Sequence, residues 1–330
     1  MTPRPIEALE RVRDHRGAVL VVGSANVDGT YYVEALPAPG ETVVTERYAQ
    51  GVGGKGANQA AAAARIGAGV GFVARVGADP AGEFVLRTLG ESGVDVGAVR
   101  VTPGSPTGNA AIAVDRAGEN SIIVAAGANA RLAASDVDDA AGRFTGAVVV
   151  VQGEISPEVI ERVSQQAMRC EARLVVNLAP FVPVADEALR AAEVLVVNET
   201  EAVDLAEHLG LGHSSDASHG QPLRGLAVAI VERLSVDLVV TLGAAGSLVV
   251  SGGELIAVTG RPAARVVDTT GAGDAFVGAL SAGLAAGIDL HSSVELATHY
   301  AAESVAAAGT VASYPTVAEL LISWGTDQDA

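Results

Sequence analysis

The stretch at residues 268–276 reads Asp268-Thr269-Thr270-Gly271-Ala272-Gly273-Asp274-Ala275-Phe276. It opens into an apolar run whose spacing predicts a buried helix, so a turn of small residues leads directly into a helix N-terminus. Unpaired backbone N–H groups and the positive end of the helix dipole would then converge on one point, which predicts an anion site. The carboxylate of Asp274 either complements the dipole or serves as a base beside a transient anion, as phosphoryl transfer to a hydroxyl requires.

Composition limits the class of protein. The 330 residues suffice for one large α/β domain or two small ones, and 49% hydrophobic with 18% charged residues predicts a sizeable core. The net charge of −18 argues against nucleic acid or an anionic membrane as a partner, because both require basic surface. The lone Cys170 cannot form an internal disulfide, which favours a reducing, cytoplasmic location. Residues 1–17 lack the apolar core of a signal peptide, and the longest apolar run, Ala275 to Ile288, is too short to cross a bilayer.

Short β-branched runs alternate with Ala-rich helical segments along the chain. The predicted strands are Ala18–Val22, Gly71–Ala74, Ala147–Val151, Leu174–Asn177, Val194–Asn198 and Leu238–Leu242. The predicted helices between them include Asn58–Ile66, Glu83–Glu91, Pro157–Cys170, Glu199–Leu209 and Leu223–Leu234. Such alternation predicts an α/β fold with a doubly wound, mainly parallel sheet flanked by helices, in which ligands bind beyond the carboxyl ends of the strands.

Two pairs of segments interrupt this alternation. Thr30–Val33 with Glu41–Tyr48, and Asn109–Val114 with Ser121–Ala125, predict hairpins outside the main sheet. We interpret residues 29–49 and 107–125 as a small β-sheet lid inserted into a single domain of residues 1–330. The Ser-, Gly- and His-rich segment 210–220 predicts a surface loop, and its His213 and His219 lack further ligands at metal-binding spacing.

A glycine-rich segment lies near the start of the chain. Gly51-Val52-Gly53-Gly54-Lys55-Gly56 matches the dinucleotide pattern G-x-G-x-x-G, but no buried strand precedes it, and Gly56 stands where a Walker loop has Ser or Thr. We interpret the segment as a loop that opens a helix at Asn58 and lets the backbone approach a ligand closely, with Lys55 and Asn58 reaching its polar groups. A flexible hairpin exit is the alternative.

Three further groups of polar or small residues follow predicted strands. Asn26 and Asp28 would face the same way along an extended strand and suit the paired hydroxyls of a sugar, although both residue types also form turns. Asn198 and Glu201 have the spacing of a capping box or of a phosphate contact with a Mg²⁺ ligand. Thr241 to Gly246 reads as a strand end and a small-residue turn that packs closely against a nucleotide or simply reverses the chain.

Together these segments resemble the pfkB, or ribokinase-like, family of sugar kinases, from about Val19 to Pro315. Two independent motifs carry the resemblance, Gly53-Gly54-Lys55-Gly56-Ala57-Asn58-Gln59-Ala60 and Asp268 to Asp274. It implies ATP-dependent phosphorylation of a sugar, with Asp274 as catalytic base and the backbone of Gly271, Ala272 and Gly273 as anion hole. On this basis we expect D-ribose 5-phosphate as product.

The resemblance also assigns binding residues. The implied sugar contacts are Asn26, Asp28, Gly54, Lys55, Asn58, Glu154 and Asp274. The implied nucleotide contacts are Asn198, Thr241, Gly243, Gly246, Gly273 and Thr298, with Glu201 organising Mg²⁺ through water. An activating K⁺ is implied at Asp268, Thr270, Ser304, Ala307, Gly309 and Ser313. A homodimer joined through the lids is the implied assembly.

Three positions depart from the family pattern and keep other acceptors open. Asn109 stands where an apolar residue is usual, Phe181 replaces a smaller residue, and Tyr31 with Tyr32 offers rings that stack on a base. The alternatives are therefore a kinase for 2-deoxyribose, a ribonucleoside or a ketohexose, and a sugar-sensing protein without turnover. A NAD-dependent oxidoreductase rests on the glycine pattern alone and lacks its strand.

Overall fold

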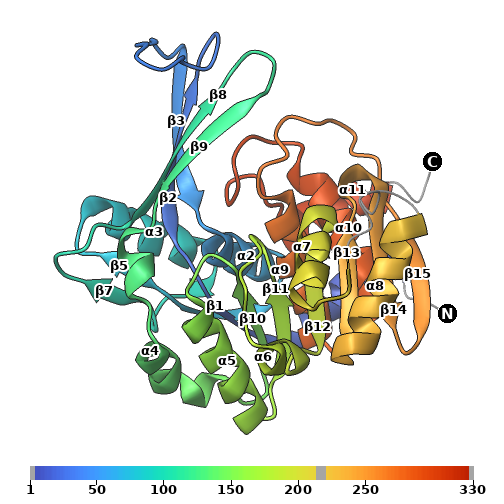
Figure 1. The fold of residues 1–330 in the computed structure, drawn as a ribbon. Helices are drawn as coiled ribbons and strands as arrows, with labels where there is room; N and C mark the ends of the chain where they lie inside the picture. The colour runs from blue at the N-terminus through green and yellow to red at the C-terminus, as the bar shows by residue number, and fades with distance from the viewer. Residues whose placement is uncertain (1–3, 213–220, 327–330) are drawn as a thin grey trace.

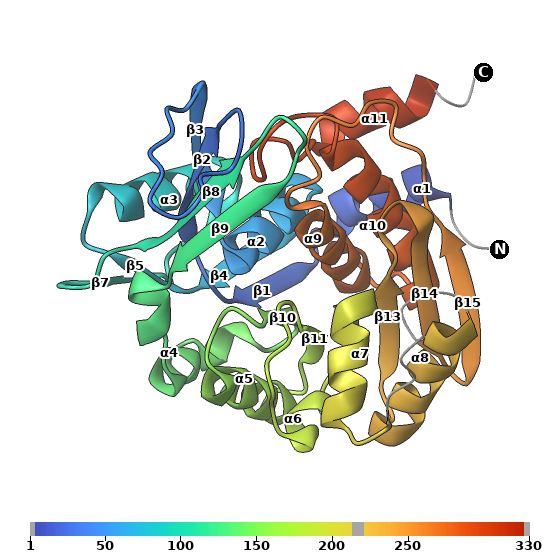
Figure 2. The same ribbon diagram turned by 45° about the horizontal axis from the view of Figure 1, so that its top comes forward.

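The computed structural model describes residues 4–212 and 221–326. The segment that contains His213 and His219 therefore lies outside the described residues. Figures 1 and 2 show a large sheet with helices on both faces and a smaller sheet that stands out from this body. No helix of the described residues is long and apolar enough to cross a membrane.

Within the described residues the large sheet has nine strands. Their order is β15 (Glu254–Thr259), β14 (Gly246–Ser251), β13 (Asp237–Thr241), β12 (Val194–Asn198), β11 (Arg173–Asn177), β10 (Val148–Gln152), β1 (Ala18–Val22), β4 (Gly69–Val73) and β6 (Val94–Asp95). The strands from β6 to β13 are parallel, whereas β14 and β15 are antiparallel at one edge. The predicted strands are all present, displaced by two residues at most.

Each face of this sheet carries its own apolar core, because successive strand residues point to opposite faces. In β1, Val19 and Val21 join one core, and Leu20 and Val22 join the other. The first face is covered by α1 (Pro5–His15), α2 (Lys55–Arg65), α3 (Pro80–Glu91), α9 (Ala272–Ala285), α10 (Leu290–Ser304) and α11 (Val317–Thr326). The second is covered by α4 (Ala134–Asp139), α5 (Pro157–Arg169), α6 (Asp186–Arg190), α7 (Glu199–His208) and α8 (Gln221–Leu234). The sheet is thus doubly wound, as predicted (Figure 2).

The small sheet has the order β3 (Arg47–Gly53), β2 (Asn26–Tyr32), β8 (Gly108–Val114) and β9 (Asn120–Ala125). Strands β2 and β8 are parallel and each outer pair is antiparallel, so the two predicted hairpins form one sheet (Figure 1). A third, two-stranded sheet pairs β5 (Arg75–Gly77) with β7 (Arg100–Thr102).

The prediction for the first hairpin was wrong in its bounds. Residues 41–45 are irregular, and the returning strand begins at Arg47 instead of Glu41 and continues through the glycines to Gly53. The hydroxyl of Thr45 donates to the carbonyls of Tyr32 and Arg47, which closes the hairpin at that point. The glycine segment thus does follow a strand, but an edge strand of the small sheet whose residues 47–50 are exposed.

The helix after this strand also begins earlier than predicted, at Lys55 instead of Asn58. Gly54 caps it with a φ of 84°, a conformation that favours glycine, so the chain turns from β3 into α2 within one residue. Asn58 and Gln59 consequently lie inside the first turns of α2.

Candidate active site

The N-termini of α2 and α9 meet at the carboxyl ends of the parallel strands. Gly278 lets these helices pack closely, because a Cβ there would lie 2.6 Å from the Cβ of Ala62. Asp274 lies in the first turn of α9 and is 6% exposed. Asn58 Nδ2 donates to its Oδ2 (2.9 Å), and Gln59 Nε2 donates to its Oδ1 (3.0 Å).

Asp274 is thus a buried carboxylate held by two neutral amides. Burial raises its pKa, while the nearby charge of Lys55 and the hydrogen bonds from Asn58 and Gln59 oppose that rise. A carboxylate with these properties is suited to accept a proton from a hydroxyl.

Lys55 lies among several carboxylates. Burial acts to lower its pKa, but the charges of Asp274, Glu154 and Glu201 outweigh burial, and the pKa is raised. Glu154 Oε2 accepts hydrogen bonds from the backbone N–H of Lys55 (2.9 Å) and from the Ser24 hydroxyl (2.6 Å). Glu154 therefore joins the loop after β10 to the start of α2.

Asn26 and Asp28 lie on one face of β2, as the predicted extended strand requires. Burial, followed by the charges of Glu154 and Asp274, raises the pKa of Asp28 to about 6. Its Oδ1 is buried without a hydrogen-bond partner. A Cβ at Gly53 would lie 1.9 Å from Asp28 Oδ2, so the carboxylate fits only because β3 carries glycine there.

The turn before α9 contains the predicted anion hole. Gly271 has a φ of 78°, and a Cβ there would lie 2.7 Å from the Tyr314 hydroxyl, which donates to the Gly271 carbonyl (3.0 Å). The N–H of Ala272 donates to the carbonyl of Thr269 (3.2 Å), so this donor is already engaged. A phosphate oxygen would have to share it.

The residues of the implied K⁺ site lie in two neighbouring loops. Asp268 Oδ1 accepts from the N–H of Thr270 (2.9 Å), and its Oδ2 accepts from the N–H of Gly309 (2.9 Å). The N–H of Val267 donates to the carbonyl of Val305, which aligns the loops. Ser304 and Ser313 are buried and donate to the carbonyls of Ala301 and Thr310, whereas Ala307 is exposed.

The implied nucleotide residues lie at and after the ends of β12 and β13, on α10 and, in the case of Gly273, in the first turn of α9. Asn198 and Glu201 form a capping box, in which Asn198 Oδ1 accepts from the N–H of Glu201 (2.8 Å) and Glu201 Oε2 from that of Asn198 (2.8 Å). Burial raises the pKa of Glu201, whereas the hydrogen bond from the Asn198 N–H and the charge of Lys55 act to lower it. In the described part of the chain, no cluster of three or more His, Cys, Asp or Glu side chains is arranged to hold a metal.

Thr241 ends β13, and the turn at Gly243–Ala245 leads to Gly246, whose φ is 105°. A Cβ on Gly246 would lie 2.1 Å from the Val258 carbonyl, so β14 and β15 require glycine there. Thr298 lines a cavity of about 420 Å³ between β15 and α10, beside Thr259, the pairing partner of Gly246. None of the implied sugar contacts lines this cavity.

Asn109 and Tyr31, two of the positions that depart from the family pattern, lie on the other face of the small sheet from Asp28, whereas Tyr32 shares the face of Asp28 and packs against Arg47. Asn109 pairs with Val27, and Tyr31 pairs with Tyr48, so they belong to the opposite face of the small sheet. The register instead puts Ala110 and Ile112 beside Asp28 and Thr30, on the same face. Phe181 packs edge-on against the ring of His208.

Several polar residues of the site were missed from the sequence. Asn129 Nδ2 donates to Asn26 Oδ1 (2.7 Å) and to the carbonyl of Ala25 (3.1 Å), and its Oδ1 accepts from the Ala25 N–H (2.9 Å). Gln59, Gln152 and Asn177 join Asp274 in a buried amide chain. Gln152 and Asn177 are the polar last residues of valine-rich strands, a signal that could have been read from the sequence.

Comparison with known proteins gives consistent matches. The profile of the pfkB family carbohydrate kinases matches residues 17–317. The chain is 35% identical over 307 residues to ribokinase of Mus musculus, covering 92% of this chain and 93% of the relative. It is 31% identical over 310 residues to deoxyribokinase of Salmonella typhi, covering 91% and 96%. The structure of Arabidopsis thaliana ribokinase complexed with ribose and ATP aligns with a TM-score of 0.82 at 30% identity, covering 93% and 98%. The predicted fold class is confirmed by this alignment.

Proposed function

Since this chain belongs to the pfkB family of carbohydrate kinases and is a sugar kinase, we propose that it transfers the γ-phosphate of ATP to the 5-hydroxyl of D-ribose. The mouse relative is a ribokinase, and the Arabidopsis ribokinase was solved with ribose and ATP. Both similarities extend over more than nine-tenths of this chain.

One observation carries the choice of a polyhydroxy acceptor. Asp28 Oδ1 and Asn58 Oδ1 are both buried without a hydrogen-bond partner. Buried acceptors are rarely left unpaired in folded proteins, so each calls for a donor from a ligand. Both residues interact with Asp274. Asn58 donates a hydrogen bond to it, and the charge of Asp274 contributes to the raised pKa of Asp28. A sugar with several hydroxyl groups would supply donors to both oxygens and present another hydroxyl to Asp274.

In the proposed reaction Asp274 accepts the proton of the attacking hydroxyl. The hydroxyl oxygen then forms a bond to the γ-phosphorus, and the bond from that phosphorus to the bridging oxygen of ADP breaks. Lys55 offsets the negative charge of the surrounding carboxylates, and the N–H groups of the Gly271–Gly273 turn stabilise charge on the transferred group. The sugar contacts we propose are Asn26, Asp28, Gly54, Lys55, Asn58 and Glu154.

For ATP we propose contacts from the turn after β13, from Asn198 and from Thr298. Mg²⁺ usually keeps several waters and binds through one or two carboxylates and the substrate phosphates. Glu201 is a single buried carboxylate, and binding of Mg²⁺ through water at this residue fits that coordination preference better than a site made of several direct protein ligands. Mg²⁺ bound there would supply charge neutralisation at the phosphates.

For the activating K⁺ we propose the loops joined by Asp268. Each oxygen of this carboxylate accepts one N–H bond, from Thr270 and Gly309, and so retains a lone pair for a cation. The remaining proposed ligands are oxygens of Thr270, Ser304, Ala307, Gly309 and Ser313. An oxygen-only donor set suits a hard monovalent cation, which would supply positive charge behind the Gly271 turn.

The small sheet is proposed to act as a lid within a single domain of residues 1–330, and to join two subunits. Its outer strand β9 is exposed along its whole length and carries Ile122, Ile123 and Val124 with exposed fractions of 53%, 73% and 60%. An apolar edge strand of this kind is an association site. A solution mass near twice the 33.0 kDa of the chain is expected, and a monomer would remove the dimer from the proposal.

A second acceptor has specific support. The Salmonella relative is a deoxyribokinase that matches over most of its length, so 2-deoxyribose is the first competitor. Ribonucleosides and ketohexoses are further alternatives, and a sugar sensor without turnover is disfavoured because Asp274 and its glycine turn are intact.

The deciding experiment is an ATP- and Mg²⁺-dependent assay with D-ribose, 2-deoxyribose, a ribonucleoside and a ketohexose, each in K⁺ and in Na⁺. We expect the highest kcat/KM for D-ribose, a 5-phosphate product, and faster turnover in K⁺. If another acceptor has the highest kcat/KM, that acceptor replaces D-ribose in the proposed reaction. Equal rates in both salts would contradict the cation site, and no product from any acceptor in a folded protein would favour a sensor.

A further inference from the structure

A chain of three buried amide side chains ends on Asp274. Gln152 Nε2 donates to Gln59 Oε1 (2.8 Å), and Gln59 Nε2 donates both to Asn177 Oδ1 (3.0 Å) and to Asp274 Oδ1 (3.0 Å). Gln59, Gln152 and Asn177 are 0%, 1% and 6% exposed. They come from α2 and from the ends of β10 and β11. The chain thus connects the proposed base to two strands of the main sheet.

The direction of every amide in this chain follows from one backbone carbonyl. Asn177 Nδ2 donates to the carbonyl of Val196 (3.0 Å), which can only accept. The Oδ1 of Asn177 must therefore face Gln59, and Gln59 must donate to it through its NH₂ group.

The orientation matters because Gln59 has two N–H donors and both are used. One is fixed on Asn177, which leaves the other aimed at Asp274 Oδ1. If Gln59 rotated by half a turn about its amide, its oxygen would face the carboxylate and repel it. Asn177 therefore acts as a lock that keeps a donor, and never an acceptor, against Asp274.

We propose that Gln59 is a positioning residue for the base, held in its donating orientation by Asn177, and that this lock keeps Asp274 ionised and oriented for the sugar hydroxyl. The proposal rests on the proposed role of Asp274 as base. Other groups act on the same carboxylate from neighbouring elements: Lys55, Asn58, Glu154, Asp28, Glu201 and Tyr314. None of them depends on Asn177, so a variant of the lock tests the chain separately from these charges.

The test compares Gln59→Met with Gln152→Met. Both substitutions remove a buried amide of the same length, but only Gln59 donates to Asp274, whereas Gln152 donates to the oxygen of Gln59. The acid limb of the pH profile of kcat/KM for D-ribose reports the ionisation of the base in the free enzyme. Because a hydrogen bond to a charged group favours ionisation, Gln59→Met should move this limb up by about one pH unit and lower kcat/KM by up to about tenfold on the acid side of the limb.

Gln152→Met, the control, should leave the acid limb at the pH of the unmodified enzyme, and KM for ATP should be unchanged in both variants. Asn177→Leu, which frees Gln59 to rotate, should move the limb in the same direction by a smaller amount. If Gln59→Met does not fold, Gln59→Glu replaces it, and two carboxylates that share a proton should move the limb upward as well.

The outcomes separate this proposal from the proposed function. An unshifted limb in Gln59→Met or its replacement, with turnover abolished in Asp274→Asn, would overturn the positioning role alone. An equal shift in Gln152→Met, or no shift in Asn177→Leu, would overturn the lock. Near-normal turnover in Asp274→Asn with the acid limb intact would instead remove Asp274 as the base.

Discussion

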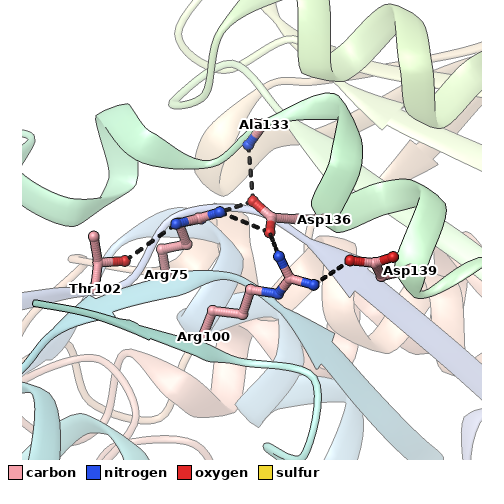
Figure 3. A network of polar contacts seen from close by, with 6 residues as sticks. All are labelled: Arg75, Arg100, Thr102, Ala133, Asp136 and Asp139. Carbon is pink, nitrogen blue, oxygen red and sulfur yellow. Dashed lines mark hydrogen bonds and ion pairs between the residues drawn. The ribbon is translucent and has the colours of Figure 1, made fainter.

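Two buried aspartates in this protein have opposite surroundings. Asp136 on α4 is 4% exposed and Asp274 on α9 is 6% exposed, so both carboxylates are removed from water to a similar degree. Asp136 accepts its hydrogen bonds from two guanidinium groups and a backbone N–H (Figure 3). Asp274 accepts from two neutral amides. The difference suits Asp136 to a structural role and Asp274 to the role of base proposed for it.

At Asp136 the charge is compensated by direct ion pairs. Arg75 binds both carboxylate oxygens (2.7 and 2.9 Å), Arg100 binds Oδ1 (2.9 Å), and the N–H of Ala133 binds Oδ2 (2.9 Å). Arg100 also contacts Asp139, and Arg75 reaches the Thr102 hydroxyl (Figure 3). The network joins α4 to β5 and β7. The charge of Asp136 is thus met by direct contacts on both of its oxygens.

At Asp274 compensation is weaker and partly at a distance. Burial raises its pKa, and Lys55 opposes this through its nearby charge. Next to it Asn58 keeps an unpartnered oxygen. Buried polar groups left short of partners are destabilising, and they concentrate where a protein binds or reacts. The comparison therefore predicts that removing the Asp274 charge harms activity, whereas removing the Asp136 charge harms stability.

The largest effect is expected for Asp274→Asn. Loss of a general base lowers kcat by about 10²–10⁴-fold, while the dissociation constant for the sugar should change little. Stability should be kept or increased, because a raised pKa in the folded state means that ionised Asp274 destabilises the fold above the ordinary aspartate range. Gln59 can still donate to the new amide oxygen, and Asn58 can rotate to accept from its NH₂. Rapid-quench kinetics and denaturant unfolding measure the two quantities, and a destabilised Asp274→Asn would mean that this charge stabilises the fold, as that of Asp136 is expected to do.

The reverse outcome is expected for Asp136→Leu. Removing one partner of a buried ion pair leaves the Arg75 side chain, 19% exposed, without its counter-ion and should lower the free energy of unfolding by about 3 kcal/mol. Turnover of the folded protein should stay within about twofold, since the network has no contact with Asp274. Asp139→Asn is the matched control, because its 62% exposed pair with Arg100 should contribute at most about 1 kcal/mol. If both variants lost the same free energy of unfolding, burial would not make the ion pairs of Asp136 more stabilising than the exposed pair of Asp139.

Sequence reasoning found Asp274 but not the amides that hold it, and the reason is physical. A turn of small residues before an apolar helix has a local meaning that can be read from nine consecutive residues. Gln59, Gln152 and Asn177 are brought together only by the crossing of α2 over the ends of β10 and β11. Their contacts depend on packing distances that no single segment encodes.

The same limit applies to the fold. Buried strands such as β12 (Val194–Asn198) were predicted at their observed bounds, because a run of β-branched residues is strong local evidence. The hairpin strand β3 was misplaced because its glycines have low strand propensity, and Gly53 is required because a Cβ there would clash with the Asp28 carboxylate. This requirement at Gly53 is visible only after the strands are placed side by side.

The smallest effect is expected for the second carboxylate of the candidate site, Asp28. Burial and the charges of Glu154 and Asp274 raise the pKa of Asp28 to about 6, so this carboxylate loses its charge on mild acidification. If the ionised form accepts sugar hydroxyls, the dissociation constant for D-ribose should rise by about tenfold between pH 7 and pH 5. Calorimetric titration with D-ribose in the absence of ATP measures this dependence, and Asp28→Asn should flatten it.

Stability should respond to pH in the opposite sense. Because the pKa of Asp28 is higher in the folded state than in the unfolded chain, its ionisation weakens the fold as pH rises from about 4 to about 6. Acidification across this window should therefore favour folding through Asp28 while it weakens sugar binding. A purely structural carboxylate, as we expect Asp136 to be, would not change stability and sugar binding in opposite directions. A dissociation constant that stays flat from pH 7 to pH 5 would assign Asp28 to structure and remove it from the sugar site.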